Sequence, residues 1–284
     1  MKLAAFEVDG RTGLARVEGD ELAVLHEGEP GAALLSVIEG RSDATAPALR
    51  RIRLDDVRLL PPAVSSRATI LCVGKNYHAH AKEFFGSGFD STGREEVPTQ
   101  PVIFGKTGSC LVGKGAEVRA SLDPTGSVDY EGELALVIGK KAQQVSRKDA
   151  YDCIFGYTIF NDVTSRELQK RHNQWLIGKS LDTFGPLGPW IVTSDEIGDV
   201  SALELLTKIN GEVRQQAKVA DLVFDIPTLI ETLTATMTLQ PGDIIATGTP
   251  AGVGIGFQPP RFLKKGDRME VSISGIGTLS NPVV

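Results

Sequence analysis

The sequence has few cysteines and no long apolar run. Its three cysteines, Cys72, Cys110 and Cys153, fit neither a disulfide framework nor the spacing of a metal-binding motif, so we expect a reducing compartment. No apolar run reaches the about 18 residues that a membrane helix needs. Glu7 and Asp9 interrupt any signal-peptide core. The sequence therefore predicts a cytoplasmic protein with no membrane partner.

A basic stripe is also missing. The 284 residues carry a net charge of −6, and no Arg-rich run occurs, which argues against nucleic acid as a partner. Aromatic residues are sparse at 6%, whereas the 31 glycines suit many turns between short strands. A hydrophobic content of 41% is typical of a globular protein, and the length allows one large or two modest domains.

A Pro61-Pro62 break divides the chain into two predicted domains, residues 1–66 and residues 67–284. The first block reads as short strands with a turn at Asp9-Gly10, followed by a helix near Ala32–Ile38. It contains no residues that suggest chemistry. We expect a small N-terminal α/β domain that packs on the main domain or helps the protein to oligomerise.

Strands dominate the second block and do not alternate with long helices, which favours a β-rich α+β fold over a doubly wound sheet. The predicted strands are TILCVG, PVIFGK, GKGAEVRA, GELALVIG, CIFGYTIFND, GPWIVT, GDIIATG and the alternating run RMEVSISGIGTLSNPVV. The predicted helices are NYHAHAKEFFG, Ser165–His172 and Pro227–Met237.

Two glycine-rich segments fail as nucleotide-binding motifs. A P-loop ending in Gly178-Lys179-Ser180 needs a glycine where Asn173 stands. The segment TGTPAGVGIGF contains no G-x-G-x-x-G and leads into Pro259-Pro260 instead of a helix. Its backbone N–H groups can still approach a ligand closely.

Three carboxylates are the strongest candidates for chemistry. Glu131 and Glu133 lie two residues apart in the alternating run VDYEGELALVIG, and Asp162 follows in IFNDVTSRELQ. On a strand, residues i and i+2 face the same side, roughly 6–7 Å apart. Two like charges in an apolar stretch need an offsetting charge, which a divalent cation with oxygen ligands supplies. The alternative is a pair of glutamates on the solvated face of an antiparallel strand.

A histidine–carboxylate pair and a lysine are weaker candidates. His80 and Glu83, at i and i+3, share a face of the predicted helix, and a carboxylate beside an imidazole raises its basicity. A solvated helix with an incidental pair is the alternative. Lys179 stands next to polar turn residues, where it would stabilise an enolate or remain a surface lysine.

Taken together and in order, the segments NYHAHAKE, VDYEGELALVIG, FNDVTSRELQ, QWLIGKSLDTFGPLGPWIVT and LQPGDIIATGTPAGVG resemble the fumarylacetoacetate hydrolase superfamily. The resemblance runs from about Thr69 to the C-terminus and is strongest to the smaller members, which include acylpyruvases and 2-oxohept-3-ene-1,7-dioate isomerases. It implies a mixed β-roll or sandwich for the catalytic domain, a small N-terminal domain and a homodimer.

The resemblance also implies roles for single residues. The implied metal ligands are Glu131, Glu133 and Asp162, with Mg²⁺ as the usual ion and Mn²⁺ or Ca²⁺ as substitutes. The implied catalytic residues are His80, Glu83 and Lys179. The implied substrate-binding residues are Arg166, Gln169, Thr249, Gly248 and Lys106.

The sequence departs from the family pattern at two places. Lys106-Thr107 replaces a frequent Lys-Pro, and QQAKVADL follows Arg214 where the family often has Gly-Asn-Thr. Both places are expected near the far end of a substrate. Residues 84–100 include the long polar segment FDSTGREEVPTQ, which we expect to form a lid.

The implied substrate is a small 2-oxo acid, bound to the cation through its carboxylate and 2-oxo oxygens. The leading hypothesis is hydrolysis of a C–C bond in a 2,4-dioxo acid such as an acylpyruvate or fumarylpyruvate, through an enolate that the cation stabilises. The alternatives are decarboxylation of oxaloacetate, or isomerisation or hydration of an unsaturated 2-oxo diacid from aromatic catabolism. A metal-binding protein without turnover is the third hypothesis.

Overall fold

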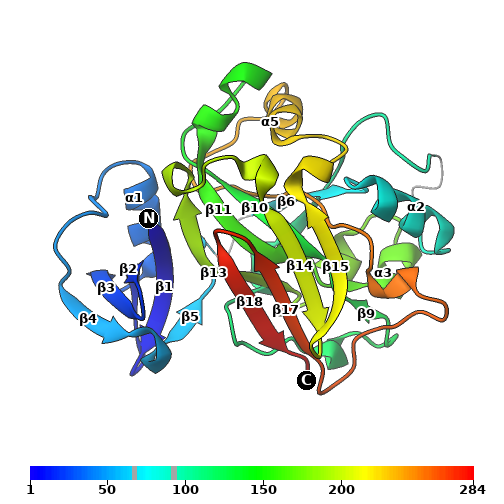
Figure 1. Cartoon of the computed structure of the whole chain (residues 1–284), viewed down its shortest axis with the longest axis horizontal. Helices are drawn as coiled ribbons and strands as arrows, with labels where there is room; N and C mark the ends of the chain where they lie inside the picture. Colours follow the sequence, from blue (N-terminus) through cyan, green and yellow to red (C-terminus); the bar gives the residue numbers. More distant parts are fainter. Residues whose placement is uncertain (66–68, 91–94) are drawn as a thin grey trace.

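The computed structural model describes residues 1–65, 69–90 and 95–284 and is rich in strands, with a few short helices (Figure 1). This agrees with the β-rich α+β fold expected from the sequence. The predicted domain boundary at residue 66 lies outside the described residues, as do residues 91–94 of the predicted lid. Within the described ranges, no helix is long and apolar enough to cross a membrane.

The N-terminal block forms antiparallel strands that continue a large sheet of the rest of the chain (Figure 1). Asp9 and Gly10, both with positive φ, form the first tight turn, as the sequence predicts. Leu3 pairs with Ile191, which joins the block to strand β13 (Gly185–Thr193). The elements of the block are β1 (Lys2–Val8), β2 (Arg11–Glu18), β3 (Glu21–Glu27), α1 (Pro30–Ile38), β4 (Arg50–Arg53) and β5 (Arg58–Leu60).

The large sheet has the order β4-β3-β2-β1-β13-β11-β10-β16-β6-β7, with β5 paired to β1 and β8 to β13. Strand β10 is buried along its whole length because side chains pack on both of its faces. A strand covered on both sides needs no alternation of polar and apolar residues. The further strands are β6 (Thr69–Gly74), β7 (Val102–Thr107), β8 (Leu111–Val112), β10 (Gly132–Ile138), β11 (Ile154–Asn161) and β16 (Ile244–Ala246).

A second sheet of order β15-β14-β17-β18 covers one face of β10 and β11 (Figure 1). Its inward residues Leu205 and Val271 pack against Leu134 and Leu136 in the largest apolar cluster. Burial of such side chains stabilises the fold by about 1.5–3 kcal/mol each. The four strands are β14 (Glu204–Ile209), β15 (Glu212–Lys218), β17 (Arg268–Ile273) and β18 (Gly277–Pro282).

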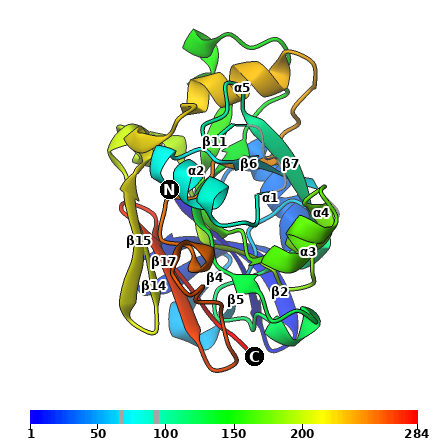
Figure 2. The same cartoon turned by 90° about the vertical axis from the view of Figure 1, so that its right-hand side faces the viewer.

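The short helices α2 (His78–Gly86), α3 (Arg166–Arg171) and α4 (Leu176–Lys179) gather at the end of the large sheet where β10 begins and β11 ends (Figures 1 and 2). Of these, α2 and α3 agree with predicted helices, whereas α4 was not predicted. The helix predicted over Pro227–Met237 is α5, which lies at the opposite end of the sheet, where Gln144 N donates to the Thr234 carbonyl oxygen. Asp225 caps α5 by accepting a hydrogen bond from Thr228 N. The remaining elements are α2 (His78–Gly86), β9 (Val128–Asp129), β12 (Thr164–Ser165), α3 (Arg166–Arg171), α4 (Leu176–Lys179) and α5 (Ile226–Thr234).

The strand predicted at GKGAEVRA is wrong. Residues 113–120 form turns with one isolated bridge, between Val118 and Val283. Gly115 has φ +83°, a value outside the region that strands occupy. A Cβ atom on Gly113 would lie 2.1 Å from the carbonyl oxygen of Leu59, so the backbone there packs directly on the end of β5. Alternating residue types alone do not reveal this close packing.

Candidate active site

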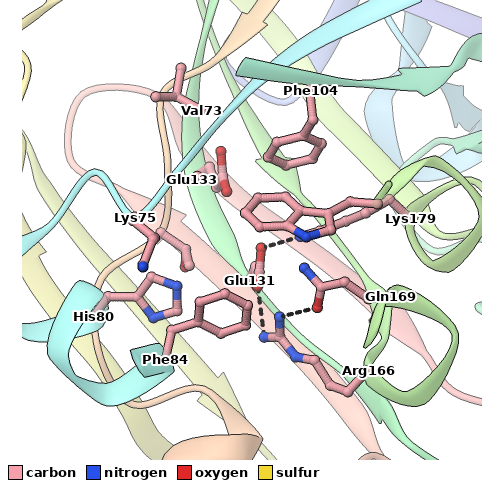
Figure 3. A pocket seen from close by; sticks show the side chains of 13 residues that line it. Val73, Lys75, His80, Phe84, Phe104, Glu131, Glu133, Arg166, Gln169 and Lys179 are labelled. Atoms are coloured by element: carbon pink, nitrogen blue, oxygen red, sulfur yellow. Dashed lines mark hydrogen bonds and ion pairs between the residues drawn. The ribbon is translucent and has the colours of Figure 1, made fainter. Parts of the chain in front are cut away.

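A small pocket lies where β10 begins, between α2 on one side and α3 and α4 on the other (Figure 3). It contains most of the residues that the sequence singled out. The lining residues are Val73, Gly74, Lys75, His80, Phe84, Phe104, Glu131, Glu133, Arg166, Gln169, Trp175, Lys179 and Thr249.

Three buried carboxylates meet at the base of the pocket. Each of Glu131, Glu133 and Asp162 offers an oxygen atom, and these atoms lie within 4.8 Å of one another. Asp162 follows β11, which pairs with β10, and Asp162 N donates to Glu131 O at 2.8 Å. Antiparallel pairing thus brings the start of one strand beside the end of the next.

The local geometry differs from the continuous strand that alternation predicts. β9 ends at Asp129 and β10 begins at Gly132, so Glu131 precedes the strand that holds Glu133. The chain changes its pairing partner here, because β9 pairs with β12 and β10 with β11. Both glutamates are buried, which excludes the alternative of a solvated strand face.

Three buried cations surround two of the carboxylates. Lys179 Nζ lies 2.6 Å from Glu131 Oε2 and 2.7 Å from Asp162 Oδ2. Lys106 Nζ lies 2.8 Å from Asp162 Oδ1, and Arg166 Nη2 lies 2.6 Å from Glu131 Oε1. Burial alone would lower the pKa of Lys179, but Asp162 and Glu131 outweigh it and raise that pKa, so the lysine is charged.

Glu133 is short of positive charge. No Lys or Arg forms an ion pair with it among the described residues, and Gly248 N donates to its Oε2 at 2.8 Å. Burial, Asp162 and Glu131 raise the pKa of Glu133 well above its usual range. In contrast, Lys179 and Arg166 outweigh burial and hold the pKa of Glu131 below its usual range. A hard divalent cation fits these oxygen ligands and the missing charge.

His80 and Glu83 form the predicted pair on α2. His80 Nδ1 lies 3.1 Å from Glu83 Oε2, and Gly252 N donates to Glu83 Oε1 at 3.0 Å. A Cβ atom on Gly256 would lie 1.7 Å from Glu83 Oε1, so only glycine leaves room for this carboxylate. With Nδ1 bonded to Glu83, Nε2 is the ring nitrogen available to a ligand in the pocket (Figure 3).

The predicted substrate-binding residues divide into three groups. Arg166, Gln169 and Thr249 line the pocket. Gly248 touches the site through its backbone N–H. Lys106 lies behind the carboxylates, where it contacts Asp162 and donates to the Val163 carbonyl oxygen at 2.9 Å, without reaching the pocket. Their roles toward a substrate stay predictions.

Sequence reasoning missed other pocket residues. Lys75 has φ +57° and donates to Asp90 Oδ2 and to the Glu95 carbonyl oxygen, both at 2.7 Å. Phe104 and Trp175 form part of the wall, with ring centroids 4.9 Å apart. A left-handed lysine gives no signal in a sequence, and single aromatic residues are more often part of a core.

Comparison with known proteins gives consistent likenesses. Residues 69–284 match the family model described as fumarylacetoacetate (FAA) hydrolase C-terminal. An oxaloacetate tautomerase of Bacillus subtilis is 49% identical over 230 residues, which span 81% of this chain and 74% of that protein.

Solved structures extend the likeness to the whole chain. A fumarylacetoacetate hydrolase from the psychrophile Exiguobacterium antarcticum is 39% identical with a TM-score of 0.83, over 100% of this chain and 99% of the other. A maleylpyruvate hydrolase from Sphingobium sp. SYK-6, in complex with manganese(II) and pyruvate, is 35% identical with a TM-score of 0.77, over the same shares.

Proposed function

Because this chain belongs to the fumarylacetoacetate hydrolase family, whose α+β fold it shares as the sequence predicted, we propose that it is a metal-dependent enzyme that interconverts the keto and enol forms of oxaloacetate. The observation that carries the proposal is the pairing of an oriented histidine, His80, with a three-carboxylate cluster in one pocket. The name of the Bacillus subtilis relative supports this choice of reaction.

Glu131, Glu133 and Asp162 would hold the cation, Mg²⁺ by preference, with Mn²⁺ or Ca²⁺ as substitutes. When bound, the cation would act as a Lewis acid toward the 2-oxo group of the substrate. The complex of the Sphingobium hydrolase with manganese(II) and pyruvate supports a divalent ion beside a 2-oxo acid.

His80 moves the proton in this proposal. Its Nδ1–H donates to Glu83, which leaves the Nε2 lone pair to take a proton from the carbon next to the 2-oxo group. The enolate oxygen then takes a proton from solvent and His80 Nε2 releases its proton to solvent, so ketone becomes enol without a change in composition and the neutral histidine is regenerated. The ammonium group of Lys179 lies beside the carboxylates, where it stabilises the negative charge of the enolate.

The substrate would be held by polar residues that line the pocket. Arg166 and Gln169, bonded to each other at 3.2 Å, present polar groups to the pocket, as does Thr249.

Hydrolysis of a C–C bond, the leading hypothesis from the sequence, is the second candidate. The same pair of His80 and Glu83 would activate water for attack on the distal carbonyl of an acylpyruvate. The Sphingobium structure, a maleylpyruvate hydrolase with pyruvate bound, favours this reading.

The cytoplasmic location and the homodimer likewise remain proposals.

A panel of substrates with Mg²⁺ separates these reactions. We expect the protein to speed the decay of the oxaloacetate enol absorbance while the total amount of oxaloacetate stays constant. EDTA should abolish this acceleration. Fumarylpyruvate and other acylpyruvates should stay intact over the same time. Release of pyruvate from an acylpyruvate would favour the hydrolase, and release of pyruvate from oxaloacetate would favour a decarboxylase.

Gly256→Ala should lower kcat for this reaction by about 10–100-fold, the range typical of lost support behind a catalytic group. The new methyl group would meet Glu83 Oε1 at 1.7 Å, so the carboxylate must move away from His80. Steady-state kinetics with oxaloacetate measure the effect. Gly198→Ala is the control, because a Cβ atom there meets nothing within 4 Å. Equal kcat values for the two variants would contradict the role given to Glu83.

A further inference from the structure

Asp129 is a wholly buried carboxylate outside the pocket whose hydrogen bonds reach two separate parts of the site. Its Oδ1 accepts from Gly254 N at 2.6 Å and from Tyr130 N at 2.9 Å. Its Oδ2 accepts from Arg166 Nε at 2.9 Å and from Ile255 N at 3.2 Å. Four N–H groups therefore donate hydrogen bonds to the two carboxylate oxygens of Asp129.

One branch of these contacts leads to the metal-binding carboxylates. The Arg166 guanidinium lies between Asp129 and Glu131. Its Nε contacts Asp129 Oδ2, and its Nη2 lies 2.6 Å from Glu131 Oε1. Its Nη1 donates to Gln169 at 3.2 Å. A planar guanidinium fixes the relative positions of the groups it binds. Asp129 thereby orients Arg166 toward Glu131.

The other branch leads to the histidine. Gly254 and Ile255, which Asp129 binds, belong to the same turn as Gly252, whose N–H donates to Glu83. A Cβ atom on Gly254 would lie 2.6 Å from Asp129 Oδ1, so the turn packs directly on the carboxylate. Residues 252–256 therefore connect Asp129 with the group that orients His80.

A second contact fixes the same turn. The hydroxyl group of Tyr130, the neighbour of Asp129, donates to the Gly252 carbonyl oxygen at 2.8 Å. Gly252 has φ +103°, and a Cβ atom there would lie 1.8 Å from the Arg214 carbonyl oxygen, so this backbone has little room to shift. The Tyr130 hydroxyl group and the Arg214 carbonyl oxygen together restrict the position of the Gly252 N–H.

We propose that Asp129 is a positioning residue for the proton transfer by His80, acting through the turn at residues 252–256 and Glu83; this assignment of its effect on turnover rests on the proposed function. Asparagine cannot replace it, because a carboxylate has only acceptors, whereas the amide NH₂ must face N–H donors in either orientation. A donor facing a donor in a buried site leaves both unsatisfied.

The first test needs no substrate. In ¹⁵N imidazole spectra of the full-length protein, with His80 assigned by its loss in His80→Ala, we expect the Nδ1–H tautomer in the wild type. Asp129→Asn should shift His80 toward the Nε2–H tautomer, as should Glu83→Ala. A wild-type tautomer in Asp129→Asn would overturn the proposal.

A matched control is Asp225→Asn. Asp225 also pairs with an arginine, Arg147, at 2.8 Å, and also accepts a backbone N–H, from Thr228 at 2.9 Å, but it caps α5 away from the pocket. Its loss should leave the His80 spectrum unchanged. A shift equal to that of Asp129→Asn would attribute the effect to general loosening and overturn the proposal.

The second test uses kinetics in two backgrounds. Asp129→Asn should lower kcat for oxaloacetate by about 10–100-fold in the wild type. In a Glu83→Ala background the factor should be at least about 3-fold smaller, because the route through Glu83 is already broken and only the contact of Asp129 with Arg166 remains. The same factor in both backgrounds would show a general structural effect and overturn the proposal.

A milder variant covers the case in which Asp129→Asn does not fold. Tyr130→Phe removes only the hydroxyl bond to Gly252 and should shift the His80 tautomer in the same direction by a smaller amount. An unchanged tautomer there would contradict the role of the turn. If the wild type shows no turnover of oxaloacetate, the proposed function fails, and the spectra still decide the positioning role.

Discussion

Glu133→Gln should weaken Mn²⁺ binding by more than about 100-fold, since the loss of groups that merely support metal ligands already costs 10–100-fold. The amide is close in shape to the carboxylate and can still accept a hydrogen bond from Gly248 N, so the change removes charge more than structure. Turnover of oxaloacetate should be abolished with the metal. Isothermal titration with Mn²⁺ and the enol assay measure the two losses.

The same variant should raise the stability of the metal-free protein. Glu133 is buried next to Asp162 and Glu131, and these like charges with burial raise its pKa, so a neutral side chain is favoured there. For a chain of this size, about 1 kcal/mol corresponds to a rise in Tm of about 2–4 °C. Mn²⁺ should then raise the Tm of the wild type but not that of the variant.

Asp243→Asn supplies the control for this prediction. Asp243 is a carboxylate in the turn before β16, where it accepts a hydrogen bond from Gln240 N at 2.7 Å, and it does not line the pocket. Its replacement should leave Mn²⁺ binding intact. Wild-type Mn²⁺ affinity in Glu133→Gln would mean that the carboxylate cluster is not the metal site.

The order of short motifs made much of this site predictable. Glu131, Glu133 and Asp162 come together because a strand and its antiparallel neighbour begin and end at the same edge, which a reading of consecutive strands anticipates. The link of Lys179 to these carboxylates followed from the resemblance, and its nitrogen lies within 2.7 Å of two of them. The reaction itself depends on how the pocket holds the substrate, which motifs do not encode.

Contacts between distant parts of the chain were not predictable. Asp129 shares the parity of Glu131 and Glu133, so alternation assigns it to their face, yet its partner Gly254 is 125 residues away. The pairing of β1 with β13, which joins the block before Pro61-Pro62 to the large sheet, is likewise a long-range contact. Both features depend on long-range pairing, for which local patterns carry no signal.

His80→Ala should lower kcat/KM for oxaloacetate tautomerisation by about 10²–10⁴-fold, the usual contribution of a positioned general base. Mn²⁺ affinity should stay the same, because His80 lies outside the carboxylate cluster. This combination would separate proton transfer from metal binding, whereas Glu133→Gln should remove both. The enol assay and a Mn²⁺ titration on the same preparation measure it.

The neighbouring histidine provides the control that gives this result its meaning. His78 lies on the same helix, two residues earlier, but it is exposed and does not line the pocket. His78→Ala should therefore keep full activity, so that any loss in His80→Ala cannot be assigned to a weakened α2. If His80→Ala retains wild-type tautomerisation, the base is another group. If it also loses Mn²⁺ binding, His80 contributes to the metal site. The assignment of proton transfer to α2 and of metal binding to the carboxylates would then be wrong.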